Sequence, residues 1–169
     1  METLSWIYPG LSPQFIYENF GNYQKGLYYL NKAIELGGEN LIYWKHLAYL
    51  NIQLEYYEEA VVAYKKVLRL QPDLYDHWIS CSELLMEIGD YHQVIELLNK
   101  ALKKFGKVGE LNYHIFCCYF LMKREKEGFF ELTRVVEAAP ELCKAMMSKY
   151  PFIFRKSLVK KLLTKHHLI

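Results

Sequence analysis

Residues 41–74 read LIYWKHLAYLNIQLEYYEEAVVAYKKVLRLQPDL. Apolar residues recur three and four places apart in each half of this stretch, which is the spacing of one face of an α-helix. Trp44, Leu47 and Ala48 mark the first helix, and the second carries Ala60, Tyr64, Val67 and Leu68. Pro72 cannot continue the second helix. The stretch therefore predicts a pair of amphipathic helices, here termed helix A and helix B, closed by a turn.

The same pattern recurs along the chain with a constant 34-residue period. Aromatic, small and branched residues all keep this interval: Tyr23, Tyr57 and Tyr91; Trp44 and Trp78; Ala33, Val67, Ala101 and Val135; Ile34, Leu68, Leu102 and Val136. Pro72 and Pro140 lie two intervals apart. A 34-residue period with two helices in each repeat is typical of an array of stacked helical hairpins.

These residues resemble the tetratricopeptide repeat family. The places that carry the resemblance in 41–74 are Trp44, Leu47, Ala48, Tyr57, Ala60, Tyr64 and Pro72. The match is good in 75–108 and weaker in 109–142, where Asn112 replaces Trp and Glu125 replaces Tyr. In 7–40 only the second half matches. The resemblance covers about residues 12–142 and implies an all-α fold, a right-handed solenoid of antiparallel helix hairpins. The length of the chain predicts a single domain over 1–169.

Residues 143–169 are predicted to cap the array. A short helix over Glu141–Lys149 would end at Tyr150 and Pro151, and a last helix would run over Phe152–His167. The apolar stripe of that last helix consists of Leu158, Val159, Leu162 and Leu163. A solenoid needs a terminal element with one apolar and one polar face, so this helix is expected to close the open end.

Two local signals concern the turns between helices A and B. Asp90, with Gln93 three places later, predicts a capping box at the start of a helix B. Gly21 and Gly89 lie where a turn between the two helices commonly needs a positive φ.

Composition narrows the class of protein. Apolar residues make up 52% of the 169, which is ample for a core, and the formal net charge is only +2. Residues 144–169 hold seven Lys or Arg and no acidic residue, which leaves 14 basic against 19 acidic residues in the rest of the chain. Four cysteines without C-x-x-C spacing, and a start that does not resemble a signal peptide, predict a cytoplasmic protein.

The sequence predicts neither an enzyme nor a cofactor. It contains none of the phosphate-loop, zinc-protease, nucleophile-elbow or dinucleotide motifs. A metal site formed by Cys81, His114 and Cys118 is one interpretation of their spacing. The simpler interpretation, which we adopt, is that the cysteines act as small buried hydrophobes.

In the tetratricopeptide family, the A helices line a concave groove, and the resemblance assigns twelve residues to it. They are Ile42, Lys45, Tyr49, Ile52, Asp76, Ile79, Glu83, Met86, Glu110, Tyr113, Cys117 and Phe120. Eight of the twelve are apolar and most of the others are acidic. The predicted partner is therefore a peptide or protein with apolar anchors and some basic residues, with a second copy of the chain as one candidate. The alternative is that several of these residues are packed core.

Some members of the family bind chaperone tails through a carboxylate clamp built from Lys, Asn and Arg. The matching places here hold Lys45, Tyr49, Ser80, Glu110 and His114. Only Lys45 fits, and Glu110 would repel a carboxylate, so this partner is rejected.

A different function could use the basic face of the last helix. Its residues are Arg155, Lys156, Lys160, Lys161 and Lys165, and they could bind anionic lipid or nucleic acid. We rank this second, because the apolar stripe of the same helix is needed for capping and the net charge is small.

Overall fold

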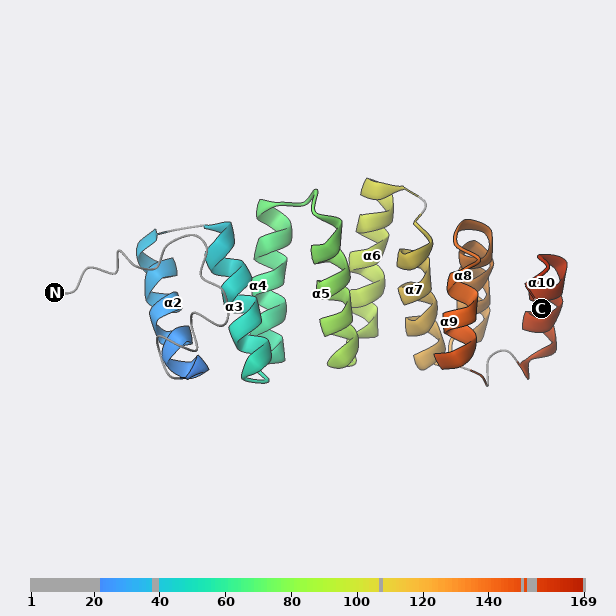
Figure 1. Cartoon of the computed structure of the whole chain (residues 1–169), viewed down its shortest axis with the longest axis horizontal. Helices are drawn as coiled ribbons and strands as arrows, with labels where there is room; N and C mark the ends of the chain where they lie inside the picture. The colour runs from blue at the N-terminus through green and yellow to red at the C-terminus, as the bar shows by residue number, and fades with distance from the viewer. Residues whose placement is uncertain (1–21, 38–39, 107, 150, 152–154, 169) are drawn as a thin grey trace. The chain divides into compact units, whose positions relative to one another are not determined.

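The computed structural model describes residues 22–37, 40–106, 108–149, 151 and 155–168, and these residues form helices and no strand. The helices are α2 (Tyr23–Gly37), α3 (Leu41–Gln53), α4 (Tyr57–Leu70), α5 (Tyr75–Glu87), α6 (Tyr91–Phe105), α7 (Gly109–Leu121), α8 (Glu125–Ala138), α9 (Leu142–Lys149) and α10 (Ser157–Lys165) (Figure 1). The all-α prediction is confirmed. The A helices are α3, α5 and α7, and the B helices are α2, α4, α6 and α8.

The repeat period is visible in the backbone of the turns between helices A and B. Glu55, Gly89 and Lys123 have φ angles of 61°, 79° and 59°. In each turn, the N–H of the next residue donates to a carbonyl of the preceding A helix: Tyr56 to Asn51 at 2.8 Å, Asp90 to Leu85 at 2.9 Å, and Arg124 to Tyr119 at 2.8 Å. Each A helix therefore ends in the same left-handed turn, which satisfies carbonyls of its last turn. The expectation for Gly89 is confirmed; Gly21 lies outside the described residues.

Asp90 caps α6, as predicted. Its Oδ1 accepts from the Gln93 backbone N–H at 3.1 Å. The Gln93 side-chain amide donates to Asp90 Oδ2 instead of accepting from the Asp90 backbone N–H. The reason is that this N–H is already bonded to the Leu85 carbonyl. The cap is thus a variant of the predicted box.

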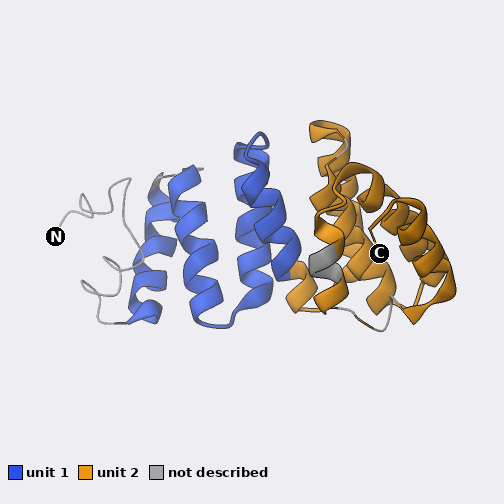
Figure 2. Ribbon diagram, turned by 45° about the vertical axis from the view of Figure 1, so that its right-hand side comes forward, with its two compact units in different colours: residues 1–84 blue, residues 85–169 orange. Residues whose placement is uncertain are grey.

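The chain divides into two compact units, residues 1–84 and 85–169, and the division falls within α5 (Figure 2). In the first unit, the core consists of Leu30, Leu47, Ala48, Leu50 and Ala63. Tyrosines from α2, α3 and α4 pack around it with their rings partly buried. The small Ala48 and Ala63 are fully buried, which lets α3 and α4 approach closely.

The second unit builds a larger core that includes the chain's last helices. Its buried members are Phe116, Cys117, Leu132, Val135, Val136, Cys143, Val159 and Leu163. Val159 and Leu163 of α10 are 2% and 0% exposed, whereas Leu158 is 56% exposed. α10 therefore packs through part of its predicted stripe. It also begins at Ser157, later than predicted, because the Lys156 backbone is extended (φ −69°, ψ 133°).

Two glycines of the second unit are required by close packing. A Cβ added at Gly109 would lie 2.2 Å from the Cβ of Ala139, and one at Gly128 would lie 2.9 Å from Phe120 Cδ2. The start of α7 thus touches the end of α8, and the start of α8 touches the end of α7. Both contacts depend on the absence of a side chain.

The two tryptophans at equivalent places differ in burial. Trp78 is 8% exposed, and its Nε1 donates to the Pro72 carbonyl at 2.9 Å. Trp44 is half-buried, with Lys66 Nζ 5.6 Å from its ring centroid. Equivalent places in two repeats thus hold one buried tryptophan and one half-buried tryptophan.

Candidate functional site

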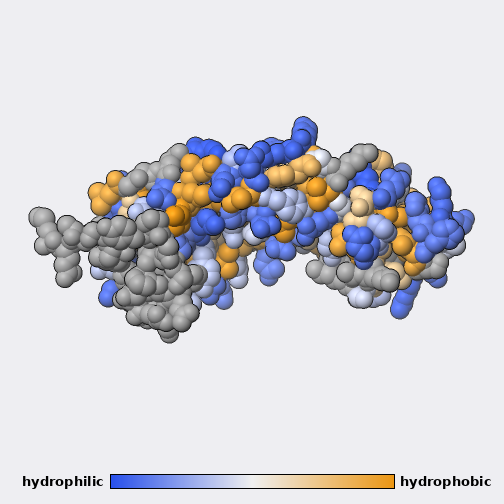
Figure 3. Space-filling view, turned by 45° about the horizontal axis from the view of Figure 1, so that its top comes forward, coloured by the Kyte–Doolittle hydropathy of each residue, from blue (hydrophilic) through white to orange (hydrophobic). Residues whose placement is uncertain are grey.

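The A helices of the first unit carry seven of the twelve predicted partner-binding residues. The apolar ones, Ile42, Tyr49, Ile52 and Ile79, are half-buried, and the charged ones, Lys45, Asp76 and Glu83, are exposed. A surface that binds apolar residues of a partner needs apolar side chains that are only partly covered, with charged side chains around them. Hydrophobic and hydrophilic residues are interspersed on the molecular face shown in Figure 3.

Residues of this surface make aromatic and electrostatic interactions with their neighbours. The rings of Tyr23 and Tyr49 meet edge to face, with centroids 6.4 Å apart. Burial and the positive charge of Lys45 both lower the pKa of His77. His77 is therefore neutral at neutral pH, and Lys45 is its cationic neighbour.

The second unit holds the other five predicted residues, and four of them lie together. Met86, Tyr113 and Phe120 pack against the same core cluster, and Cys117 is part of that cluster. Glu110 is exposed. Burial raises the pKa of the Tyr113 hydroxyl, so this tyrosine stays neutral.

Cys117 is 2% exposed and cannot touch a partner in this structure. Its neighbours in the core cluster include Cys143 of α9 and Val159 and Leu163 of α10. For this residue the alternative interpretation, packed core, describes the structure.

The basic face of α10 is partly engaged within the chain. Lys156 forms an ion pair with Glu125 and lies 5.7 Å from the ring centroid of Phe120. Lys160, Lys161 and Lys165 are exposed. Three cations on so short a helix form a small positive surface.

All four cysteines are buried, and none of them forms a disulfide. Burial raises the pKa of Cys81 and of Cys143 to about 11 and that of Cys118 to about 12. At neutral pH these thiols are protonated and poor nucleophiles or ligands. Within the described part of the chain, no three His, Cys, Asp or Glu side chains are placed to hold a metal ion.

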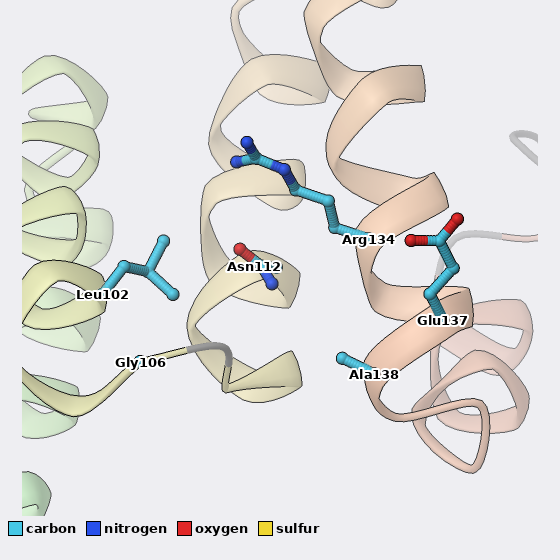
Figure 4. Close-up of a pocket in the computed structure, with 6 residues that line it drawn as sticks. All are labelled: Leu102, Gly106, Asn112, Arg134, Glu137 and Ala138. Carbon is cyan, nitrogen blue, oxygen red and sulfur yellow. The ribbon is translucent and has the colours of Figure 1, made fainter.

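Sequence reasoning missed a cleft of about 630 Å³ in the second unit. It is lined by Leu102, Gly106, Asn112, Arg134, Glu137 and Ala138 (Figure 4). None of the twelve predicted residues is among them. The available signal was the replacement of Trp by Asn112, because a small amide cannot fill the space of an indole.

None of the helices in the described ranges combines the length and the apolar character needed to cross a membrane.

Comparison with known proteins decides the family of the central repeat. The tetratricopeptide repeat model matches residues 43–74. Residues 43–74 form a tetratricopeptide repeat. This is the stretch in which the sequence signature was strongest, and the tetratricopeptide resemblance is thereby confirmed. No curated protein matches the chain significantly.

Solved structures that the chain is similar to include tetratricopeptide proteins. A crystal structure of MamA has a TM-score of 0.67 at 13% identity, covering 95% of this chain and 92% of that one. MamA from Desulfovibrio magneticus RS-1 has a TM-score of 0.63 at 19% identity, covering 89% of this chain and 85% of that one. YrrB is described as a TPR protein with an unusual peptide-binding site. Its structure has a TM-score of 0.61 at 17% identity, covering 90% of this chain and 81% of that one. At these identities the likeness establishes the fold: an α-solenoid of tetratricopeptide hairpins.

Proposed function

We propose that this chain is a non-enzymatic scaffold or adaptor that binds a peptide or protein segment through its A helices. The observation that carries the proposal is the composition of these helix faces, where half-buried apolar side chains lie among exposed charged ones. The tetratricopeptide fold supports it, since this fold presents helix faces to other chains. A relative of the same fold, YrrB, is described as having a peptide-binding site.

Tyr49, Ile79, Glu83, Tyr113 and Phe120 are the proposed main contacts. Aromatic rings that are already partly held by neighbours lose little conformational freedom on binding, so Tyr49, Tyr113 and Phe120 are the anchors. Glu83, with Asp76 and Glu110, is exposed and favours a partner that carries Lys or Arg. Ile42, Lys45, Ile52 and Met86 complete the proposed surface.

The second candidate, binding of anionic lipid or nucleic acid by α10, has weaker support. The ion pair of Lys156 with Glu125 reduces the charge available to an anionic surface. Val159 and Leu163 are committed to the core and cannot insert into a bilayer. We therefore propose a protein partner. We also propose a reducing compartment such as the cytoplasm, in keeping with four cysteines that form no disulfide.

The test is site-specific photo-crosslinking in the source cell. A photoreactive phenylalanine analogue is placed at Tyr49 or at Tyr113, and at Tyr28 as the matched control. Tyr28 is a tyrosine of a B helix and is 60% exposed, so it reports random encounters. We expect the same crosslinked protein from Tyr49 and Tyr113 and none from Tyr28.

Two results would contradict the proposal. Equal crosslinking from all three positions would mean that the A helices have no special role. Retention on heparin or anionic vesicles that is lost on replacing Lys160, Lys161 and Lys165 with Gln, without any protein crosslink, would favour the second candidate.

A further inference from the structure

The cleft between α6 and α8 is lined by Asn112, a buried residue whose side chain has a polar atom without a hydrogen-bond partner. Asn112 of α7 is 4% exposed, and its Oδ1 accepts no hydrogen bond from the described residues. In Figure 4, Leu102 and Ala138 point toward Asn112, and the Arg134 guanidinium reaches across α7. A buried carbonyl oxygen without a donor is costly, so its presence in a cleft points to a donor supplied from outside.

The equivalent positions of the other repeats indicate which chemical group could supply the missing donor. Asn112 lies one repeat after Trp78 and two repeats after Trp44, so two other repeats hold an indole at this place. Trp78 shows how such an indole is satisfied, because its N–H bonds to the Pro72 carbonyl. Trp44 shows what lies over its face, which is Lys66 at 5.6 Å. Arg134 occupies the place of Lys66 two repeats later.

We propose that this cleft binds the indole ring of a tryptophan carried by a partner segment. The indole N–H donates to Asn112 Oδ1, and the Arg134 guanidinium lies over the ring. Leu102 and Ala138 supply apolar contact. The volume of about 630 Å³ falls within the roughly 300–1,000 Å³ of ligand pockets.

Arg134 is already held for this role by two contacts. Its Nη1 lies 3.1 Å from Glu131 Oε1, and its Cζ lies 4.5 Å from the Phe130 ring centroid. Because these contacts already restrict the guanidinium, placing it over the indole ring of the ligand costs little further conformational entropy. Glu131 is 6% exposed and anchors the ion pair from the protein side.

The rim of the cleft favours a side chain attached to a peptide over a free aromatic molecule. Gly106, Arg134, Glu137 and Ala138 are all exposed, so the cleft is open where the backbone of a partner would run. Glu137 can accept hydrogen bonds from such a backbone. The lining of the cleft shares no residue with the proposed A-helix surface, and neither proposal depends on the other.

The first experiment compares ligands that differ only in the donor. The ¹⁵N-labelled chain is titrated with N-acetyltryptophanamide, its 1-methyl derivative and indole, followed by NMR. We expect shifts confined to residues around the cleft, and an affinity about 3- to 10-fold higher for N-acetyltryptophanamide than for the methylated ligand, the worth of one hydrogen bond. Free indole is expected to bind more weakly than N-acetyltryptophanamide.

The second experiment changes the cleft. Asn112→Leu keeps the volume but removes the acceptor, and should bring the two affinities to the same value. Asn112→Trp restores the residue of the other repeats, and should abolish binding while raising the unfolding temperature. Asn99→Leu, an exposed amide on α6, is the matched control and should bind as the wild type does.

The proposal is overturned if none of the three ligands shifts the cleft residues. It is also overturned if Asn112→Trp, folded by circular dichroism, still binds, or if the methylated ligand binds the wild type as well as the parent does. Tighter binding of indole than of N-acetyltryptophanamide would refute the peptide source and assign the cleft to small aromatic molecules.

Discussion

Glu55 and Lys123 hold a backbone conformation that favours glycine, which the equivalent turn has at Gly89. A left-handed φ costs a residue with a Cβ roughly 1–2 kcal/mol. We expect Glu55→Gly and Lys123→Gly each to raise the free energy of unfolding by about 0.5–1 kcal/mol, after the added entropy of the unfolded chain is subtracted. Urea unfolding measures this.

The matched control for these turns is Gly89→Ala. No heavy atom lies within 4 Å of an added Cβ there, so only the backbone conformation opposes the change. It should destabilise by about 1 kcal/mol. A neutral effect of all three changes would mean that the turn geometry does not limit stability.

Gly109 gives a steric prediction at the same scale. Its added Cβ would meet the Cβ of Ala139 at 2.2 Å, so Gly109→Ala should destabilise the chain by about 1–3 kcal/mol. Ala139→Gly in the same chain removes the clashing atom and should recover part of the loss. If the double variant is no more stable than Gly109→Ala, the contact is not the cause.

At the scale of the helix, Trp78 connects α5 to the turn before it. Trp78→Ala should cost about 3–5 kcal/mol, the usual penalty for removing a large buried side chain. Trp78→Phe keeps most of the volume and loses the hydrogen bond to Pro72, and should cost about 1–2 kcal/mol. Thermal unfolding, followed by circular dichroism, measures the stability lost in each variant. Equal losses in Trp78→Ala and Trp78→Phe would show that the buried volume of the ring is not the main contribution.

The helices themselves could be predicted from the sequence because their apolar spacing is dictated by the periodicity of the α-helix. α10 could not be placed as well: nothing in the order of apolar residues before Ser157 reveals that Lys156 takes an extended backbone. The burial of Cys117 could also not be predicted from the residue pattern of a single repeat. Cys117 belongs to a cluster that also includes Cys143 of α9 and Val159 and Leu163 of α10, which lie outside the repeat of Cys117.

The cleft at Asn112 shows the same limit for a site. The replacement of Trp by Asn is visible in the sequence, but whether neighbouring side chains fill the space is a property of packing. Leu102, Arg134 and Ala138 leave it open, and their positions come from two other helices. Substitution signals of this kind therefore need the surrounding helices before they can be interpreted.

For the whole molecule, the buried thiols predict a pH limit. The folded-state pKa values of Cys81, Cys118 and Cys143, about 11, 12 and 11, lie above the ordinary value of 9.0. Below pH 9 the thiols are neutral in both states and their burial is fully favourable. Above it the unfolded chain ionises first, so stability should fall between pH 9 and 11.

This decline is measured by urea unfolding at each pH. A variant with Cys81, Cys118 and Cys143 replaced by Ala has no such ionisation and should lose less stability over the same interval, although it starts lower. Parallel declines in the two proteins would assign the effect to tyrosines and lysines instead.

The recurring turn at Glu55, Gly89 and Lys123 makes the chain modular. Since each turn closes on the helix before it through the same pair of hydrogen bonds, cutting or joining the chain at equivalent points in two turns leaves both turns with their own partners. An engineered chain that duplicates residues 56–89 should therefore gain one whole hairpin without a new junction to design. A lineage of such proteins could change length by in-frame duplication alone.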